Sequence, residues 1–162
     1  MATLAQQPIV SLPGQDTNIG VPGSAIFHRA KSSDTNGVFS VVELVTEPGQ
    51  GVSLHVHTHE DELVYVVDGQ LEVTLGDQKM TATAGVLALL PRGIPHGFTN
   101  TGGTPSRLLD VILPGTFDNY FVALHNLARI GERAGRTPRE RFRPGQATSK
   151  QWLLRTKGDK IP

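Results

Sequence analysis

Between residues 25 and 115 the chain consists of short runs of hydrophobic residues separated by glycine, proline and aspartate. Residues 71–75 alternate between aliphatic and polar side chains, which predicts a strand with one buried and one polar face. The β-branched run 63–67 predicts another strand, closed by a hairpin signal at Asp68-Gly69. Similar runs cover residues 25–29, 38–46, 80–84, 85–90 and 107–113. With the histidine-bearing segments described below, the pattern predicts eight or nine strands in an all-β barrel or jelly roll.

The pattern changes after Pro114-Gly115, where hydrophobic residues begin to recur at helical spacing. Thr116 is a suitable N-terminal cap for an amphipathic helix whose apolar face would carry Phe117, Tyr120, Phe121 and Leu124. The sequence therefore predicts three parts: an N-terminal arm over residues 1–24, a barrel over residues 25–115, and a C-terminal helical, basic tail over residues 116–162.

Composition limits the chemistry and the partners. The chain has 162 residues, which is most simply one domain, and it has no cysteine, so disulfides and thiolate ligands are excluded. Its net charge is zero, yet ten of its fifteen basic residues lie between Arg129 and Lys160. A basic segment can bind nucleic acid, but no aromatic interleaving accompanies this one. We therefore favour a solvated tail that packs against acidic surface of its own chain or of a partner subunit.

No apolar run approaches the length of a membrane span, and the first ten residues lack both the basic start and the apolar stretch of a signal peptide. We therefore expect no membrane partner and a cytoplasmic location.

Three histidines and a glutamate are the candidate metal ligands. His55 and His57 lie two residues apart in a strand-like run, so both imidazoles leave the same face. Glu62 heads the next strand, and His96 follows a turn rich in proline and glycine. This mixed nitrogen and oxygen set suits Fe, Mn, Ni, Co, Cu or Zn and suits Mg or Ca poorly.

The spacing of these residues resembles both sequence motifs of the cupin superfamily. The first motif is matched without a gap by Gly49, His55-x-His57, Glu62 and Gly69, and the second by Gly85, Pro91-x-Gly93, His96 and Asn100. The HEDE-x-x-Y-V-x-x-G run and a later Pro-Gly-x-Phe segment are similar to single-domain bacterial cupins of the quercetin dioxygenase type. The glycines are interpreted as turn formers, and Pro91 and Asn100 as residues of turns and strand ends.

The resemblance implies a cupin jelly-roll β-barrel with a C-terminal helical extension. It also implies one divalent transition metal per chain, held by His55, His57, Glu62 and His96. Because single-domain cupins commonly pair, we expect a homodimer.

Other residues near the motifs have open roles. His59 is either an additional ligand or base, or a solvent-facing turn residue, and we favour the latter. Glu60 and Asp61 are interpreted as loop carboxylates that orient the turn. Phe98, two residues after His96, is the candidate substrate-binding aromatic, whereas an aromatic stripe at helical spacing is more often core. Glu62 is also the candidate proton acceptor.

Three classes of function remain open. The favoured one is a quercetinase-like dioxygenase that uses O2 to cleave a flat anionic enol, such as a flavonol or β-diketone. The second is non-oxidative metal chemistry by an isomerase, cyclase, decarboxylase or lyase, and the third is a non-catalytic barrel that binds a small molecule. Fold and ligands alone do not select among them.

Overall fold

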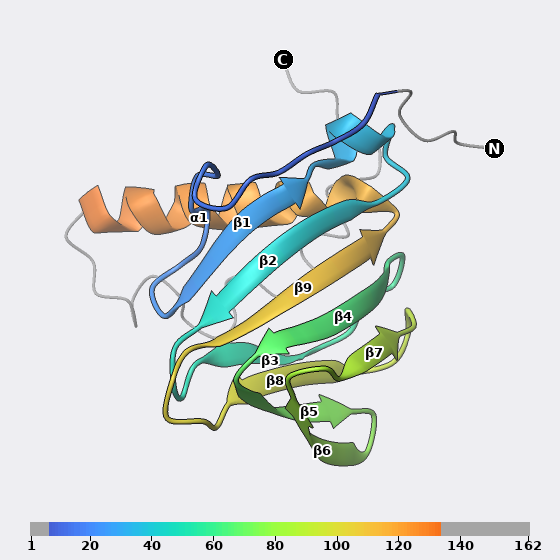
Figure 1. Ribbon diagram of the computed structural model, residues 1–162, viewed down its shortest axis with the longest axis vertical. Helices are drawn as coiled ribbons and strands as arrows, with labels where there is room; N and C mark the ends of the chain where they lie inside the picture. Colours follow the sequence, from blue (N-terminus) through green and yellow to red (C-terminus); the bar gives the residue numbers. More distant parts are fainter. Residues whose placement is uncertain (1–6, 134–162) are drawn as a thin grey trace. The chain divides into compact units, whose positions relative to one another are not determined.

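The computed structural model describes residues 7–133. Nine strands precede one long helix in this part of the chain (Figure 1). The strands are β1 (Ser24–Ala30), β2 (Ser40–Thr46), β3 (Gly51–His55), β4 (Asp61–Asp68), β5 (Gln70–Leu75), β6 (Gln78–Thr83), β7 (Leu87–Leu90), β8 (His96–Asn100) and β9 (Ser106–Leu113). The helical elements are η1 (Ser32–Thr35), η2 (Gly115–Phe117) and α1 (Asp118–Arg133).

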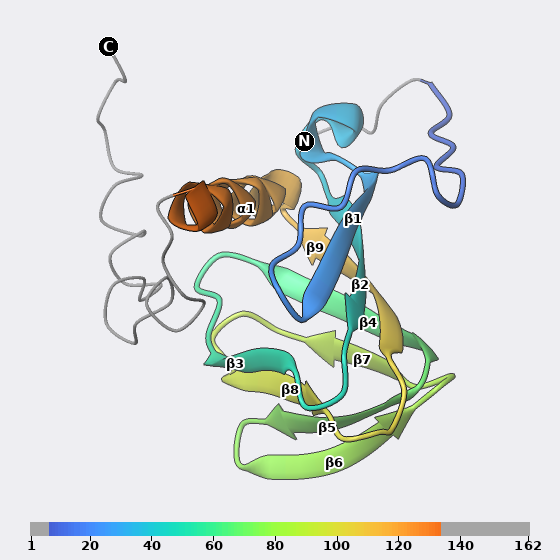
Figure 2. The same cartoon turned by 90° about the vertical axis from the view of Figure 1, so that its left-hand side faces the viewer.

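The strands form two antiparallel sheets that face each other, which confirms the predicted jelly roll (Figure 2). One sheet has the order β1-β2-β9-β4-β7 and the other has the order β3-β8-β5-β6. Alternate residues of the first sheet meet alternate residues of the second in the space between the sheets. The buried core cluster between the sheets contains Ile26, Val42, Leu44, Val66, Leu71, Ala82, Leu108 and Ile112.

The strand around residues 71–75 has the predicted two-faced character. Leu71 is buried at 1% exposure, and Val73 packs against the core cluster. The hairpin at Asp68-Gly69 also forms, joining β4 to β5. Gly69 has a φ of 83°, and a Cβ there would lie 2.7 Å from the Cα of Ser106. Glycine is required at this turn because any side chain would meet both backbone strain and β9.

Helix α1 begins two residues later than its predicted cap. Residues Gly115–Phe117, which include Thr116, form the single 3-10 turn η2, and Asp118 is the first helical residue. The carboxylate of Asp118 accepts hydrogen bonds from the backbone N–H and the hydroxyl of Ser32, both at 2.8 Å. These long-range bonds tie the start of the helix to η1.

Most of the predicted basic tail, residues 134–162, lies outside the described residues, so its helical character remains a prediction. Within residues 7–133, no helix is both long enough and apolar enough to cross a membrane.

Candidate metal centre

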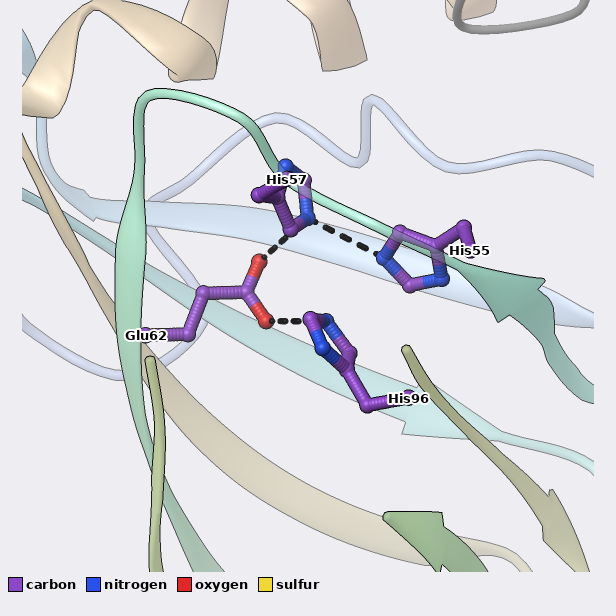
Figure 3. A group of neighbouring side chains, drawn as sticks. All are labelled: His55, His57, Glu62 and His96. Carbon is purple, nitrogen blue, oxygen red and sulfur yellow. Dashed lines mark hydrogen bonds and ion pairs between the residues drawn. The ribbon is translucent and has the colours of Figure 1, made fainter. Parts of the chain in front are cut away.

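Four side chains from three parts of the barrel meet between the two sheets (Figure 3). His55 is the last residue of β3 and pairs across the sheet with His96, the first residue of β8. Glu62 comes from β4 of the opposite sheet, and His57 lies in the connection between β3 and β4. One ligand atom from each of the four residues can be chosen so that all lie within 4.8 Å of one another.

The predicted ligand residues are therefore brought together. The Nε2 atom of His57 lies 3.0 Å from Nε2 of His55 and 3.0 Å from Oε1 of Glu62. The Nε2 atom of His96 lies 3.2 Å from Oε2 of the same carboxylate. His57, Glu62 and His96 are buried, while His55 is half-buried.

Backbone carbonyl groups set the direction in which two of the imidazoles point. Nδ1 of His55 lies 2.8 Å from the carbonyl oxygen of Ser53, and Nδ1 of His96 lies 2.9 Å from that of Ile94. A carbonyl oxygen only accepts, so each Nδ1 carries the hydrogen and donates it. In the neutral ring the Nε2 atom then keeps its lone pair, and that lone pair faces the centre.

The arrangement fits a cation. On His57, Nδ1 lies 3.5 Å from a carboxylate oxygen of Glu60, which favours the same tautomer. Two neutral imidazoles that face each other through Nε2 at 3.0 Å repel unless a proton or a metal ion lies between the lone pairs. Three imidazole nitrogens and one carboxylate match the donor preference of divalent transition metals. The residues present thus fit the metal that the sequence motifs imply.

The ionisation of the centre follows from its burial and its mixed charges. Burial alone would raise the pKa of Glu62, but in the metal-free protein the hydrogen bonds that His57 and His96 donate through Nε2 when protonated outweigh it and lower the pKa to about 2. Burial lowers the pKa of His55. Burial also acts to lower the pKa of His96, yet the carboxylate of Glu62 raises it overall. At neutral pH the site therefore offers one anionic oxygen ligand.

The turn between His57 and β4 is held by the second motif. Asp61 accepts hydrogen bonds from the backbone N–H of Arg92 at 2.8 Å and from its guanidinium at 2.6 Å, and these bonds lower the pKa of Asp61 to about 2. The backbone N–H of Gly93, which has a φ of 82°, donates to the carbonyl oxygen of His57 at 2.7 Å. His59 is exposed and is not among the four clustered residues.

The aromatic residue that contacts the centre is Phe117, which the sequence interpretation assigned to the core. Its ring lies perpendicular to that of His57, with centroids 4.5 Å apart, and it stacks on Tyr120 at 5.1 Å. Phe98, the predicted substrate-binding aromatic, is half-buried in β8 and packs against the core cluster. The Pro-Gly-x-Phe segment noted in the sequence was the signal that could have identified Phe117.

Sequence interpretation also passed over Asp110, a carboxyl group in the middle of β9. It is only 6% exposed, and its Oδ1 has no hydrogen-bond partner among the described residues. Burial raises the pKa of Asp110 well above its usual range, and the negative charge of Glu62 adds to this. The available signal was strand parity, since Asp110 shares the face of the buried Leu108 and Ile112.

Comparison with known proteins agrees with this architecture. Residues 42–112 match the Cupin domain family model. The chain also matches a solved RmlC-like cupin from Shewanella frigidimarina with a TM-score of 0.59 and 21% identity, covering 72% of this chain and 99% of that one.

Several curated proteins match part of this chain. Protein SchB of Streptomyces halstedii is 37% identical over 85 residues, 52% of this chain and 60% of that protein. Mannose-1-phosphate guanylyltransferase 2 of Escherichia coli O157:H7 is 34% identical over 49% of this chain and 17% of its own length. Quercetin 2,3-dioxygenase of Bacillus subtilis is 29% identical over 60% of this chain and 28% of its own length.

The chain thus spans less than two thirds of each of these three curated relatives. On the combined evidence of the domain match, the fold and the clustered candidate ligands, residues 42–112 of this chain form a cupin domain.

Proposed function

We propose that the protein is a metal-dependent dioxygenase that cleaves a flat anionic enol, such as a flavonol or β-diketone. The observation that carries the proposal is the convergence of three Nε2 atoms and one carboxylate at a buried point between the sheets. A divalent ion held there by His55, His57, Glu62 and His96 would supply a Lewis-acidic, redox-capable centre for an enolate and O2.

Charge favours an anionic substrate. A divalent ion held by these four residues, of which one is a carboxylate, would keep about one net positive charge and would leave room among its ligands for a substrate. The pKa of Glu62 lies at about 2, so its carboxylate is ionised at neutral pH. Glu62 is in addition the proposed acceptor for the enol proton as the substrate binds.

The surroundings favour a flat, largely apolar molecule. The ring of Phe117 contacts His57, while Val64, Val73 and Phe98 pack against the core cluster between the sheets. Such side chains would bury the aromatic or alkyl part of a substrate, and the oxygen of the substrate would bind at the metal centre. The similarity to the quercetin 2,3-dioxygenase of Bacillus subtilis supports this assignment over the stretch that aligns.

Oxygen consumption tests the proposal. Protein loaded separately with Fe, Mn, Ni or Co is assayed on an oxygen electrode with flavonols, catechols and β-diketones. We expect at least one loaded form to consume O2 faster than the free metal does. Glu62→Gln should retain the fold and lose most turnover. No acceleration by any loaded form would contradict the dioxygenase assignment.

The second candidate is non-oxidative metal chemistry, supported by the match to a mannose-1-phosphate guanylyltransferase, a protein of a different activity. The same metal-loaded samples, assayed without oxygen against sugars and small acids, distinguish it. Anaerobic turnover together with no O2 uptake would favour an isomerase, cyclase, decarboxylase or lyase. Ligand binding without turnover in either assay would favour the third candidate, a non-catalytic binding barrel.

A further inference from the structure

Asp110 is a buried carboxyl group that the fold does not satisfy. Its Oδ1 is inaccessible to solvent and has no hydrogen-bond partner within residues 7–133, and the whole residue is 6% exposed. A buried polar group without a partner destabilises the folded state, because it gives up its hydrogen bonds to water and gains none in return. Packing therefore gives no reason for a carboxyl group at this position.

The strand register places this group next to the metal centre. Asp110 pairs with Val42 on one side and with Val64 on the other, so its two lateral neighbours are both apolar. Glu62 pairs with Ile112, two residues further along β9, and is thus the diagonal neighbour of Asp110 on the same sheet.

Alternation then sets the direction of the side chain. Along β9 the buried positions are Ser106, Leu108, Asp110 and Ile112, and Leu108 and Ile112 belong to the core cluster between the sheets. Glu62 is likewise a buried position of β4. Asp110 and Glu62 therefore both point into the space between the sheets, and one residue pair separates their positions along the strands.

We propose that Asp110 is a substrate-binding residue whose carboxyl group hydrogen-bonds the anion held at the metal centre. The inference rests on the proposed function, because it requires that an anion binds at the metal centre. This hydrogen bond gives the unpartnered carboxyl group a partner. It also selects for ligands that carry an acceptor oxygen beside the oxygen that binds the metal. In this hydrogen bond the carboxyl group is neutral and donates its hydrogen to the anion.

Three variants separate this role from a structural one. Asp110→Leu removes the polar group and keeps the branched shape, whereas Asp110→Asn keeps a donor and an acceptor. Ser106→Ala is the matched control, because Ser106 lies on the same face of β9, is 1% exposed, and also has an unpartnered side-chain oxygen among the described residues. Asp110→Ala replaces the leucine variant if that one does not fold.

The experiment titrates Co(II)-loaded protein with acetylacetone, an anionic enol, and separately with acetate, following the visible absorption of the metal. Metal content and Tm are measured on the same samples. We expect Asp110→Leu to keep its metal, to melt no lower than wild type, and to bind both anions about tenfold or more weakly. Asp110→Asn should bind within roughly threefold of wild type, and Ser106→Ala should be unchanged.

Each other outcome has a definite meaning. Equal anion affinity in wild type and Asp110→Leu at full metal content would overturn the role of Asp110. Loss of metal in Asp110→Leu would make Asp110 a support for Glu62 and would also overturn it. If wild type binds acetate and not acetylacetone, the enol substrate is wrong, and the acetate titrations still decide on Asp110. Binding of neither anion by wild type overturns both proposals.

Discussion

The Nε2 atoms of His55 and His57 face each other at 3.0 Å, although the carbonyl oxygen of Ser53 holds the hydrogen of the His55 ring on the opposite nitrogen. Two lone pairs at this distance repel, so the geometry is favourable only when a proton or a metal ion lies between them. The side chains are held in this arrangement by backbone contacts outside the cluster. The protein therefore presents a preformed set of donors to a metal.

The first prediction concerns metal content. Protein purified without a metal-affinity step should carry close to one divalent transition metal per chain, and His57→Ala should lose most of it because a central ligand is removed. His59→Ala is the matched control, since this exposed histidine lies two residues away and outside the cluster. Elemental analysis measures both. Full occupancy in His57→Ala would show that the ligand assignment is wrong.

Acid should release the metal. Imidazole binds a metal only when its Nε2 is unprotonated, and the reference pKa of about 6.5 is lowered in effect by the metal itself. Release is expected roughly between pH 4 and pH 6. Metal retained after dialysis at each pH is measured by elemental analysis. A metal content unchanged at about pH 3.5 would exclude histidine ligation.

In the metal-free protein, Glu62 should make stability depend on pH. The pKa of Glu62 falls from 4.5 to about 2 on folding, so its contribution is fully present above pH 4.5 and is lost as pH falls toward 2. His96 has a raised pKa, so its contribution is present below 6.5 and is lost as pH rises through the folded value. Urea unfolding of the apoprotein between pH 2 and pH 8 should show both slopes, and Glu62→Gln should flatten them. Identical pH curves for the two proteins would contradict the assignment.

Two aromatic residues should differ in what their loss affects. Phe98→Ala should weaken substrate binding more than metal binding, and it should also lower stability by about 2–4 kcal/mol because the ring packs against the core. Phe117→Ala should weaken both substrate binding and metal binding, since its ring contacts the candidate metal ligand His57, and it should also lower stability because the ring packs against the core cluster. Ligand titration, metal analysis and urea unfolding of both variants measure these effects. Equal substrate affinity in wild type and both variants would show that neither aromatic residue takes part in substrate binding.

Asn100→Ala should reduce stability without removing the metal. The buried Asn100 amide donates to the carbonyl oxygens of Thr46 and Thr104, at 2.8 and 2.9 Å, and its oxygen accepts from the N–H of Gly102. Losing these bonds leaves backbone groups unpaired, at a cost of about 2–4 kcal/mol in the free energy of unfolding. The exposed Gln70 supplies the control, Gln70→Ala, which should cost less than about 0.5 kcal/mol. Similar unfolding midpoints for the two variants would refute this account.

The sequence by itself was sufficient to predict the barrel and the four residues, His55, His57, Glu62 and His96, that the structure brings together as candidate metal ligands. Strand alternation has a period of two, so inward and outward positions can be read directly from residues such as Leu71 and Val73. The motif histidines could also be identified as candidate ligands, because the type of donor atom and the spacing between residues are local properties of the chain. Tertiary structure was needed to bring Glu62, on one sheet, to within 3.2 Å of His96, on the other.

Only the tertiary structure decided which other groups surround the centre. Phe117 belongs to a series of aromatic residues at helical spacing, which is typical of core residues. Its contact with His57 depends on where η2 starts after β9. Asp110 has the inward parity of a core residue, but its missing hydrogen-bond partner is visible only when the neighbouring strands are in place. Contacts between residues far apart in sequence depend on the register and packing of whole sheets. Local patterns do not encode those distances.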